Sequence, residues 1–184
     1  MDKDRNYYKN TYHHLYNRGA NKGVIFYERE NYLYFLRRMK YYGMKFRINI
    51  LAYCLMPNHF HLFVQQTTDE YSISIFISSL LNSYVKAFNK KYKRSGTLFE
   101  SKTKSKQILD EGYFKWVIKY IIENPMKAGL TEEVSDWEFS NAKDLLNMRR
   151  GNLTNVSLVM SFFQSADSMI KFLLDKSVKT VYEF

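Results

Sequence analysis

The sequence is poor in cysteine, glycine, proline and long apolar runs. Its single cysteine, Cys54, cannot form a disulfide within the chain or supply a thiolate cluster for zinc. Seven glycines and two prolines among 184 residues fall well below the roughly 12% of an average chain, which excludes collagen-like and disordered classes. No apolar run approaches the roughly 18 residues of a membrane span, and the first ten residues hold no apolar signal core. We therefore expect a cytoplasmic protein without membrane contacts.

Acidic residues are also scarce beside basic ones. The chain has 28 Lys and Arg against 18 Asp and Glu, which gives a net charge of +10 and a pI of about 9.5. This excess indicates a polyanionic partner such as nucleic acid, although it serves solubility equally well. Hydrophobic residues make up 46% and aromatic residues 17%, so the chain can bury a sizeable core. The length suits one domain with an appended tail.

Strand and helix patterns alternate along most of the chain. Strands are expected at 12–17, 47–55, 59–65 and 97–109, and helices at 28–42, 72–92 and 110–124. Asp110 is placed to cap the third helix, and Pro125 disfavours its continuation. The polar segment 147–155 lacks apolar periodicity and is the best candidate for a boundary. We therefore expect a catalytic domain over 1–147 and a helical C-terminal extension over 148–184.

Two of the four histidines lie in the motif His59-Phe60-His61. Because side chains alternate along a strand, His59 and His61 share one face and Phe60 points to the other. Their Cα atoms are then roughly 6.5 to 7 Å apart, so both rings can converge on one cation. The spacing alone also suits two surface histidines on a half-exposed sheet.

The third expected helix carries Trp116, Tyr120 and Asn124 on one flank, each four residues from the next. A phenol is a nucleophile that can attack phosphorus, and an amide oxygen one turn away can complete a metal shell begun by two histidines. Considered alone, Tyr120 is better explained as one of 16 tyrosines, half-buried between a helix and a sheet.

Two blocks of the sequence join these motifs. LAYCLMPNHFHLF (51–63) and KYIIENPMKAGL (119–130) resemble the two signature blocks of the single-tyrosine HUH transposases, in particular the REP-associated tyrosine transposase group. Two further stretches, YHHLYNRGANKGVIFY and SYVKAFNKKYKRSGTLFE, are also similar to members of that family. The resemblance covers residues 12–146.

The resemblance implies a fold and a set of site residues. The fold is α+β, a ferredoxin-like antiparallel sheet with helices on one face. His59 and His61 are the implied ligands of Mg²⁺ or Mn²⁺, with Asn124 as the third ligand, and Tyr120 is the implied nucleophile. Family members often have a histidine where this chain has Ile122, which should point away from the tyrosine and leave the chemistry intact.

The implied activity is that of a transposase. It nicks single-stranded DNA near hairpins through a 5′-phosphotyrosine intermediate and transfers the strand to another end, at the nucleoid of a bacterial-type cell. One alternative is a DNA-binding regulator that kept the fold and lost catalysis. Another is a metal-dependent nuclease that uses water and forms no adduct. The wider family includes domain-exchanged dimers, so a homodimer is one of the assemblies that the resemblance allows.

A free tyrosine has a pKa near 10, so attack near neutral pH needs help. Metal-bound solvent or the positive field of Lys119 and its neighbours could supply it. The sequence does not choose between them.

Basic side chains are the candidates for contacts with DNA. Lys102, Lys104 and Lys106 share one face of the fourth expected strand, where they can hold phosphates or simply protect a sheet edge from aggregation. Such phosphate contacts give salt-dependent affinity that is largely independent of base sequence. The other candidates are Lys90, Lys91, Arg94 and Arg18.

Overall fold

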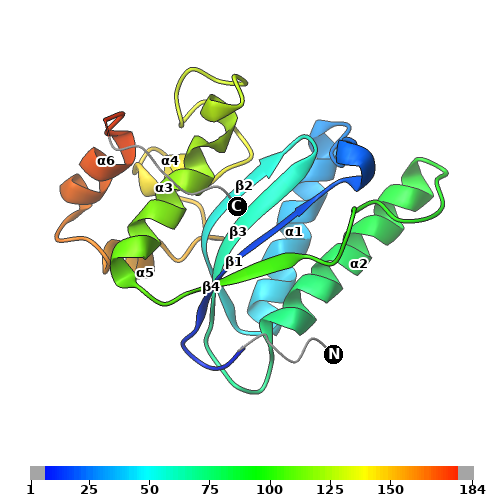
Figure 1. The fold of residues 1–184 in the computed structure, drawn as a ribbon, viewed down its shortest axis with the longest axis horizontal. Helices are drawn as coiled ribbons and strands as arrows, with labels where there is room; N and C mark the ends of the chain where they lie inside the picture. The colour runs from blue at the N-terminus through cyan, green and yellow to red at the C-terminus, as the bar shows by residue number, and fades with distance from the viewer. Residues whose placement is uncertain (1–6, 178–184) are drawn as a thin grey trace.

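The fold is built on a four-stranded antiparallel sheet (Figure 1). A computed structural model describes residues 7–177. The strands are β1 (Tyr12–Arg18), β2 (Ile48–Met56), β3 (His59–Gln66) and β4 (Lys104–Ile108), in the order β2-β3-β1-β4. The helices are η1 (Ala20–Lys22), α1 (Arg29–Lys45), α2 (Ile73–Lys91), α3 (Glu111–Lys127), α4 (Ala142–Leu145), α5 (Val156–Met160) and α6 (Ala166–Leu174). The predicted α+β class and antiparallel sheet are confirmed.

Helices α1 and α2 cover one face of the sheet (Figure 1). Phe60 and Leu62 of β3 point to this face and are fully buried there. They pack with Phe35 of α1 and with Phe76 and Leu80 of α2, which recur at helical spacing. This layer is the helical cover that the family resemblance implied.

Helix α3 lies on the opposite face, where the prediction placed no helix. Its buried residues Val117, Ile118 and Ile121 join a second core cluster with Phe63 of β3 and Cys54 of β2. Residues of α5 and α6 pack into the same cluster. The sheet is covered on both faces because the third helix has an apolar stripe of its own to bury.

The outer edge of β2 is covered by the chain that follows α3. Trp137 Nε1 donates to Leu55 O at 2.9 Å. The fully buried side chain of Asn141 accepts from Tyr53 N at 3.0 Å and donates to Leu51 O at 3.1 Å. Leu51 lies where the pairing of β2 with β3 shifts register, so Asn141 satisfies backbone groups at a bulge.

The C-terminal helices are attached to α3 through a buried cation. Lys119 Nζ lies 2.8 Å from Glu123 Oε1 and donates to Leu173 O, at the end of α6, at 2.9 Å. Lys127 forms a second ion pair with Glu123 at 3.0 Å. Residues on both sides of the boundary predicted at 147 thus belong to one core cluster. Residues 1–6 and 178–184, which fall in the two predicted domains, lie outside the described residues.

The predicted boundaries of β4 and α3 differ from the structure. Strand β4 begins at Lys104 rather than at residue 97, because residues 97–103 form irregular backbone. Helix α3 continues through Pro125 to Lys127. Proline lacks the N–H that would bind Ile121 O, and the side chain of Asn124 approaches that carbonyl instead. The proline therefore sits in the last turn without ending the helix.

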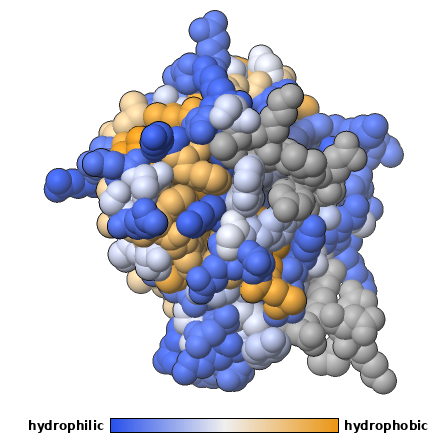
Figure 2. Space-filling view, turned by 60° about the vertical axis from the view of Figure 1, so that its left-hand side comes forward, coloured by the Kyte–Doolittle hydropathy of each residue, from blue (hydrophilic) through white to orange (hydrophobic). Residues whose placement is uncertain are grey.

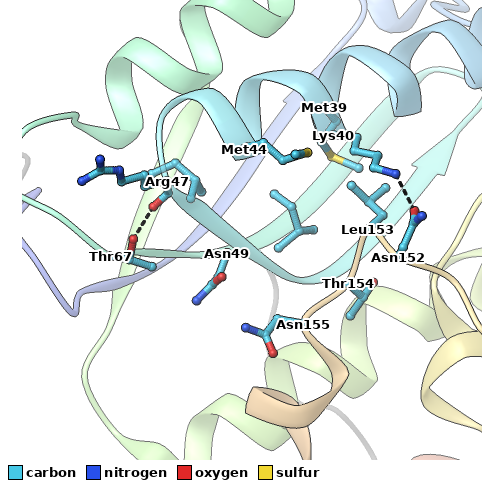
Figure 3. A pocket seen from close by; sticks show the side chains of 13 residues that line it. Met39, Lys40, Met44, Arg47, Asn49, Thr67, Asn152, Leu153, Thr154 and Asn155 are labelled. Carbon is cyan, nitrogen blue, oxygen red and sulfur yellow. Dashed lines mark hydrogen bonds between the residues drawn. The ribbon is translucent and has the colours of Figure 1, made fainter.

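A cavity of about 400 Å³ lies at the start of β2 (Figure 3). It is bordered by α1, by the start of β2 and by residues 152–155. Lys40 Nζ donates to Asn152 Oδ1 at 2.8 Å across its rim. None of its lining residues is His, Cys, Asp or Glu, so it offers none of the side chains that bind metal ions most strongly.

The surface around α5 and α6 is mixed in character. Figure 2 shows hydrophobic residues in small groups between hydrophilic ones. Leu109 and Met148 are among the exposed hydrophobic residues of the molecule.

Over residues 7–177, no helix combines the length and the apolar character needed to cross a membrane.

Candidate active site

Strand β3 places the two histidines of the HxH motif on the α3 side of the sheet. The ring centroids of His59 and His61 are 5.2 Å apart, whereas Phe60 is buried on the opposite face. The pairing of β1 with β3 sets Arg18 beside His59 and Tyr16 beside His61. The alternation expected from the sequence therefore brings two imidazoles and one guanidinium to the same face.

Helix α3 brings Tyr120 to this pair. Asp110 caps the helix by accepting a hydrogen bond from Tyr113 N at 2.9 Å, and the apolar stripe of α3 fixes its rotation on the sheet. The ring centroid of Tyr120 lies 5.5 Å from that of His61, with the rings nearly perpendicular. Residues about 60 positions apart thus form one site within a single chain.

Asn124 lies one turn beyond Tyr120 on the same flank. Its Nδ2 donates to Tyr120 O at 2.8 Å and approaches Ile121 O, the carbonyl without a partner from Pro125, at 3.4 Å. The amide nitrogen is therefore held against the helix backbone, which leaves Oδ1 as the outward group. An amide side chain can turn either its oxygen or its nitrogen towards a neighbour, and these two contacts favour the orientation in which the Asn124 oxygen faces away from the helix.

The site residues line a pocket of about 240 Å³. Six predicted site residues line it: His59, His61, Tyr120, Asn124, Arg18 and Lys104. Glu100, Ser101, Tyr16 and Asn17 complete most of the remaining wall. Ile122 is fully buried in the core cluster behind α3, so it faces away from this pocket as expected.

Burial keeps the histidines uncharged near neutral pH. It lowers the pKa of His59, and the charge of Arg18 lowers it further, whereas a hydrogen bond with Asn124 acts in the opposite direction. Burial also lowers the pKa of His61 well below its usual value, with His14, His59 and Arg18 adding to the effect. A neutral imidazole has a lone pair to offer, so both rings are suited to bind a cation.

Each histidine has one ring nitrogen engaged by a neighbour. His59 Nδ1 lies 2.7 Å from Asn58 Oδ1, and His61 Nδ1 lies 2.9 Å from His14 Nε2. Ligation through Nε2 requires the proton on Nδ1, which these partners can accept. The two Nε2 atoms and the Oδ1 of Asn124 are neutral donors of kinds that divalent cations accept. Across residues 7–177 no group of three His, Cys, Asp or Glu side chains is arranged to hold a metal ion, so a cation bound by this pair would take a further ligand from another type of side chain, such as the amide of Asn124.

His14 is a site residue that sequence reasoning missed. It is fully buried on β1, and its ring lies 5.1 Å from that of His61 and 6.0 Å from that of Tyr120. Burial, followed by the charge of Lys106, lowers its pKa to about 3. Two adjacent histidines in the first strand were the available signal, but the pairing of β1 with β3 was needed to select one of them.

The positive field of Lys119, one of the two expected aids to ionisation of the Tyr120 phenol, is not found in the structure. Burial raises the pKa of Tyr120, while a hydrogen bond with Asn124 and the charge of Arg18 act to lower it. Lys119, expected to supply a positive field, instead binds Leu173 O and Glu123 on the other flank of α3. Arg18 and Lys127, whose Nζ lies 5.2 Å from the Tyr120 ring centroid, are the cations near the phenol.

The predicted DNA-binding lysines of β4 flank the pocket. Lys104 and Lys106 are exposed, and the pairing of β4 with β1 places them beside Tyr16 and His14, on the site face. Lys102 precedes the strand and lines a neighbouring groove instead. Two of the three lysines therefore project from the same sheet face as the histidines.

The basic residues at the end of α2 lie outside the pocket. Lys91 forms an ion pair with Glu28, and Arg94 lies over the ring of Phe88, 5.5 Å from its centroid. Lys90 is exposed at the same helix end. If they contact DNA, they do so away from Tyr120.

Comparisons with known proteins identify relatives of this chain. A family model described as "Transposase IS200 like" matches residues 6–124, a span that contains both histidines, the tyrosine and the asparagine. A protein of Haemophilus influenzae described as "Putative REP-associated tyrosine transposase" is 30% identical over 101 residues, which are 50% of this chain and 57% of that protein. The chain thus spans little more than half the length of this relative.

A solved structure supports the fold independently. It is described as a REP-associated tyrosine transposase bound to a REP hairpin, and it superposes with a TM-score of 0.65. The match covers 84% of this chain and 94% of that one at 18% identity, which establishes a shared fold. The family resemblance seen in the sequence is confirmed. Because the family model spans well over half of the chain and includes the whole candidate site, this protein belongs to the IS200-like transposase family.

Proposed function

We propose that this protein is a metal-dependent endonuclease and strand transferase for single-stranded DNA, which nicks near hairpins through a 5′-phosphotyrosine at Tyr120. The observation that carries the proposal is the position of Tyr120, which shares one pocket with His59 and His61. A hairpin substrate is supported by the fold neighbour, which was solved with a REP hairpin. With chromosomal DNA as its substrate, the protein would act at the nucleoid.

In the first step, the phenol oxygen of Tyr120 attacks phosphorus and the bond from phosphorus to the 3′ oxygen breaks. The phenol proton is lost, and the departing 3′ oxygen gains a proton to become a hydroxyl. One phosphodiester is exchanged for another, so a different 3′ hydroxyl can reverse the step and complete strand transfer without an external energy source. A covalent intermediate of this kind divides one displacement into two.

The other site residues bind and orient the phosphate. Mg²⁺ or Mn²⁺, held by His59, His61 and Asn124, would supply charge neutralisation for the phosphate oxygens. Arg18 and Lys104 border the pocket and can bind the phosphates on either side of the scissile one. Arg18 also favours the ionised phenol, in opposition to burial. The resulting raised pKa of Tyr120 predicts that the rate of adduct formation increases with pH from neutral to mildly alkaline conditions.

A covalent capture experiment tests the proposal. The protein is incubated with Mn²⁺ and an oligonucleotide that carries a hairpin and an unpaired flank, and adducts are resolved on a denaturing gel. The wild type should form an adduct and Tyr120→Phe none, while His59→Ala and His61→Ala should lose the adduct formation that divalent ions support. Tyr113→Phe, two turns earlier on α3, is the matched control and should form the adduct normally.

The outcomes separate the competing functions. An adduct formed by Tyr120→Phe would show that the nucleophile is another residue. Cleavage by the wild type without an adduct would identify a nuclease that uses water. Binding of the hairpin without cleavage would identify a regulator that has lost catalysis.

A further inference from the structure

A groove lies along α2, next to the active-site pocket. It has a volume of about 650 Å³, within the range of about 300 to 1,000 Å³ typical of ligand sites. One wall is α2, and the other is the segment 96–103, which returns from the far end of α2 to β4 (Figure 1). Asn17, Glu100 and Ser101 line both the groove and the pocket. The two cavities are therefore neighbours that share part of their walls.

The groove has an apolar floor and an uncharged polar rim. Ile77, Leu81 and Val85, spaced four residues apart on α2, form the floor together with Phe99 from the facing segment. The rim on α2 consists of Ser74, Ser78 and Asn82, again at four-residue spacing and all exposed. Flat apolar rings with polar edges match this lining, because the floor can contact ring faces while hydroxyl and amide groups bond ring edges.

The wall opposite α2 is fixed to the strand that carries Arg18. Glu100 N donates to Arg18 O at 3.0 Å, and Ala20 N donates to Leu98 O at 3.0 Å. The buried side chain of Asn17 donates to Ser101 O at 3.0 Å. Leu98 is itself buried in the core cluster beneath α2. The groove is thus a built feature that is connected to the active site by hydrogen bonds.

The charges around the groove suit nucleic acid. Helix α2 has no acidic residue along its 19 positions. The polar series of its rim continues with the same spacing to the exposed Lys86 and Lys90. Inside the groove, Lys102 and Glu100 are the one cation and the one anion of the lining. A neutral groove with cations at its end fits bases inside and phosphates along the rim.

We propose that this groove binds the bases of unpaired DNA nucleotides that adjoin the scissile phosphate. The proposal rests on the proposed function, since it requires a single strand at the pocket, and it adds the place where that strand continues. The half-buried Phe99 provides a ring on which a base can stack. Binding there would fix the position of the strand and hence the phosphodiester that reaches Tyr120.

A binding experiment without chemistry tests the groove. Fluorescently labelled hairpins, with an unpaired flank on the 5′ side, on the 3′ side or on neither, are titrated with protein in EDTA and followed by anisotropy. Ser78→Glu, at the exposed rim, should weaken binding of one of the flanked hairpins about tenfold and leave the hairpin without a flank unaffected. Replacing the flanking bases by abasic sites should weaken binding to the wild type and remove the effect of Ser78→Glu.

The control is Ile75→Glu, which adds the same charge to the same helix outside the groove. It should bind all three hairpins as the wild type does. Equal binding of the flanked hairpins by Ser78→Glu and wild type would overturn the proposal, as would a loss that Ile75→Glu shares. A change in sedimentation instead of DNA affinity would identify the groove as a protein interface and overturn it too. None of these results depends on cleavage, so a failure of the groove and a failure of the tyrosine chemistry are separate outcomes.

Discussion

His14→Phe is expected to weaken the binding of divalent cations without disrupting the fold. His14 Nε2 lies 2.9 Å from His61 Nδ1, and the two rings are stacked with centroids 5.1 Å apart. Phenylalanine preserves a ring of similar size at this fully buried position but removes the nitrogen. The substitution therefore isolates the hydrogen bond that orients His61 and fixes its proton.

The magnitude follows from the usual effect of a residue that orients a metal ligand. Removal of such an outer-shell partner typically weakens metal affinity by about 10- to 100-fold. This corresponds to about 1.4 to 2.7 kcal/mol. We therefore expect the dissociation constant for Mn²⁺ to rise by one to two orders of magnitude. The unpartnered His61 Nδ1 would separately lower the free energy of unfolding by about 1 to 3 kcal/mol, with or without the metal.

Isothermal titration calorimetry with Mn²⁺ in the absence of DNA provides the measurement. His13→Phe is the matched control, because His13 is the adjacent residue, equally buried, and points to the opposite face of β1. It should leave the affinity unchanged. His14→Gln restores an acceptor oxygen and should recover part of the loss. If His14→Phe bound Mn²⁺ as the wild type does while His61→Ala did not, the role assigned to His14 would be refuted.

Four further predictions concern stability and assembly. Asn141→Leu leaves the two backbone groups of β2 that its amide binds without partners, and should lower the free energy of unfolding in urea by about 2 to 5 kcal/mol. Lys119→Met leaves the buried carboxylate of Glu123 paired with the exposed Lys127 alone, and should lower the free energy of unfolding by about 3 kcal/mol in the same assay. A decrease of less than about 1 kcal/mol would contradict a structural role for the ion pair between Lys119 and Glu123. Because the pKa of His14 is low in the folded protein, the unfolded chain binds more protons than the folded one below about pH 6.5, and the free energy of unfolding should fall as the pH decreases from about 6.5 towards 3. In His14→Phe this decrease should be less steep, by up to about 1.4 kcal/mol per pH unit. Because one chain contains the whole site, a mixture of Tyr120→Phe and His61→Ala should form no adduct; recovery of activity would demonstrate a shared, domain-exchanged site.

The site residues that could be predicted from the sequence are those linked by local spacing. The HxH alternation is a property of one strand, and the step from Tyr120 to Asn124 is one turn of one helix. Neither spacing shows that the two motifs meet, and it was the family resemblance that joined them. Physical reasoning from the chain therefore supplied two halves of a site without their relation in space.

The residues that escaped prediction depend on contacts between distant segments. His14 and His61 are 47 residues apart and meet only through the register of β1 with β3. Pro125 predicted the end of α3, but the amide of Asn124 compensates for the missing N–H, and the helix continues. Lys119 looked available to the phenol because it precedes Tyr120, yet adjacent residues on a helix face different directions.

The burial of the single thiol has a practical consequence. Cys54 is fully buried in the core cluster behind α3, and burial raises the pKa of its thiol, so reagents that modify thiolates should not react with it in the folded protein. One cysteine introduced at an exposed position would then be the sole reactive thiol. Ser78→Cys would allow disulfide cross-linking to an oligonucleotide with a tethered thiol at each flanking position in turn. The nucleotide that cross-links fastest would measure how far along the strand the groove lies from the cleaved phosphate.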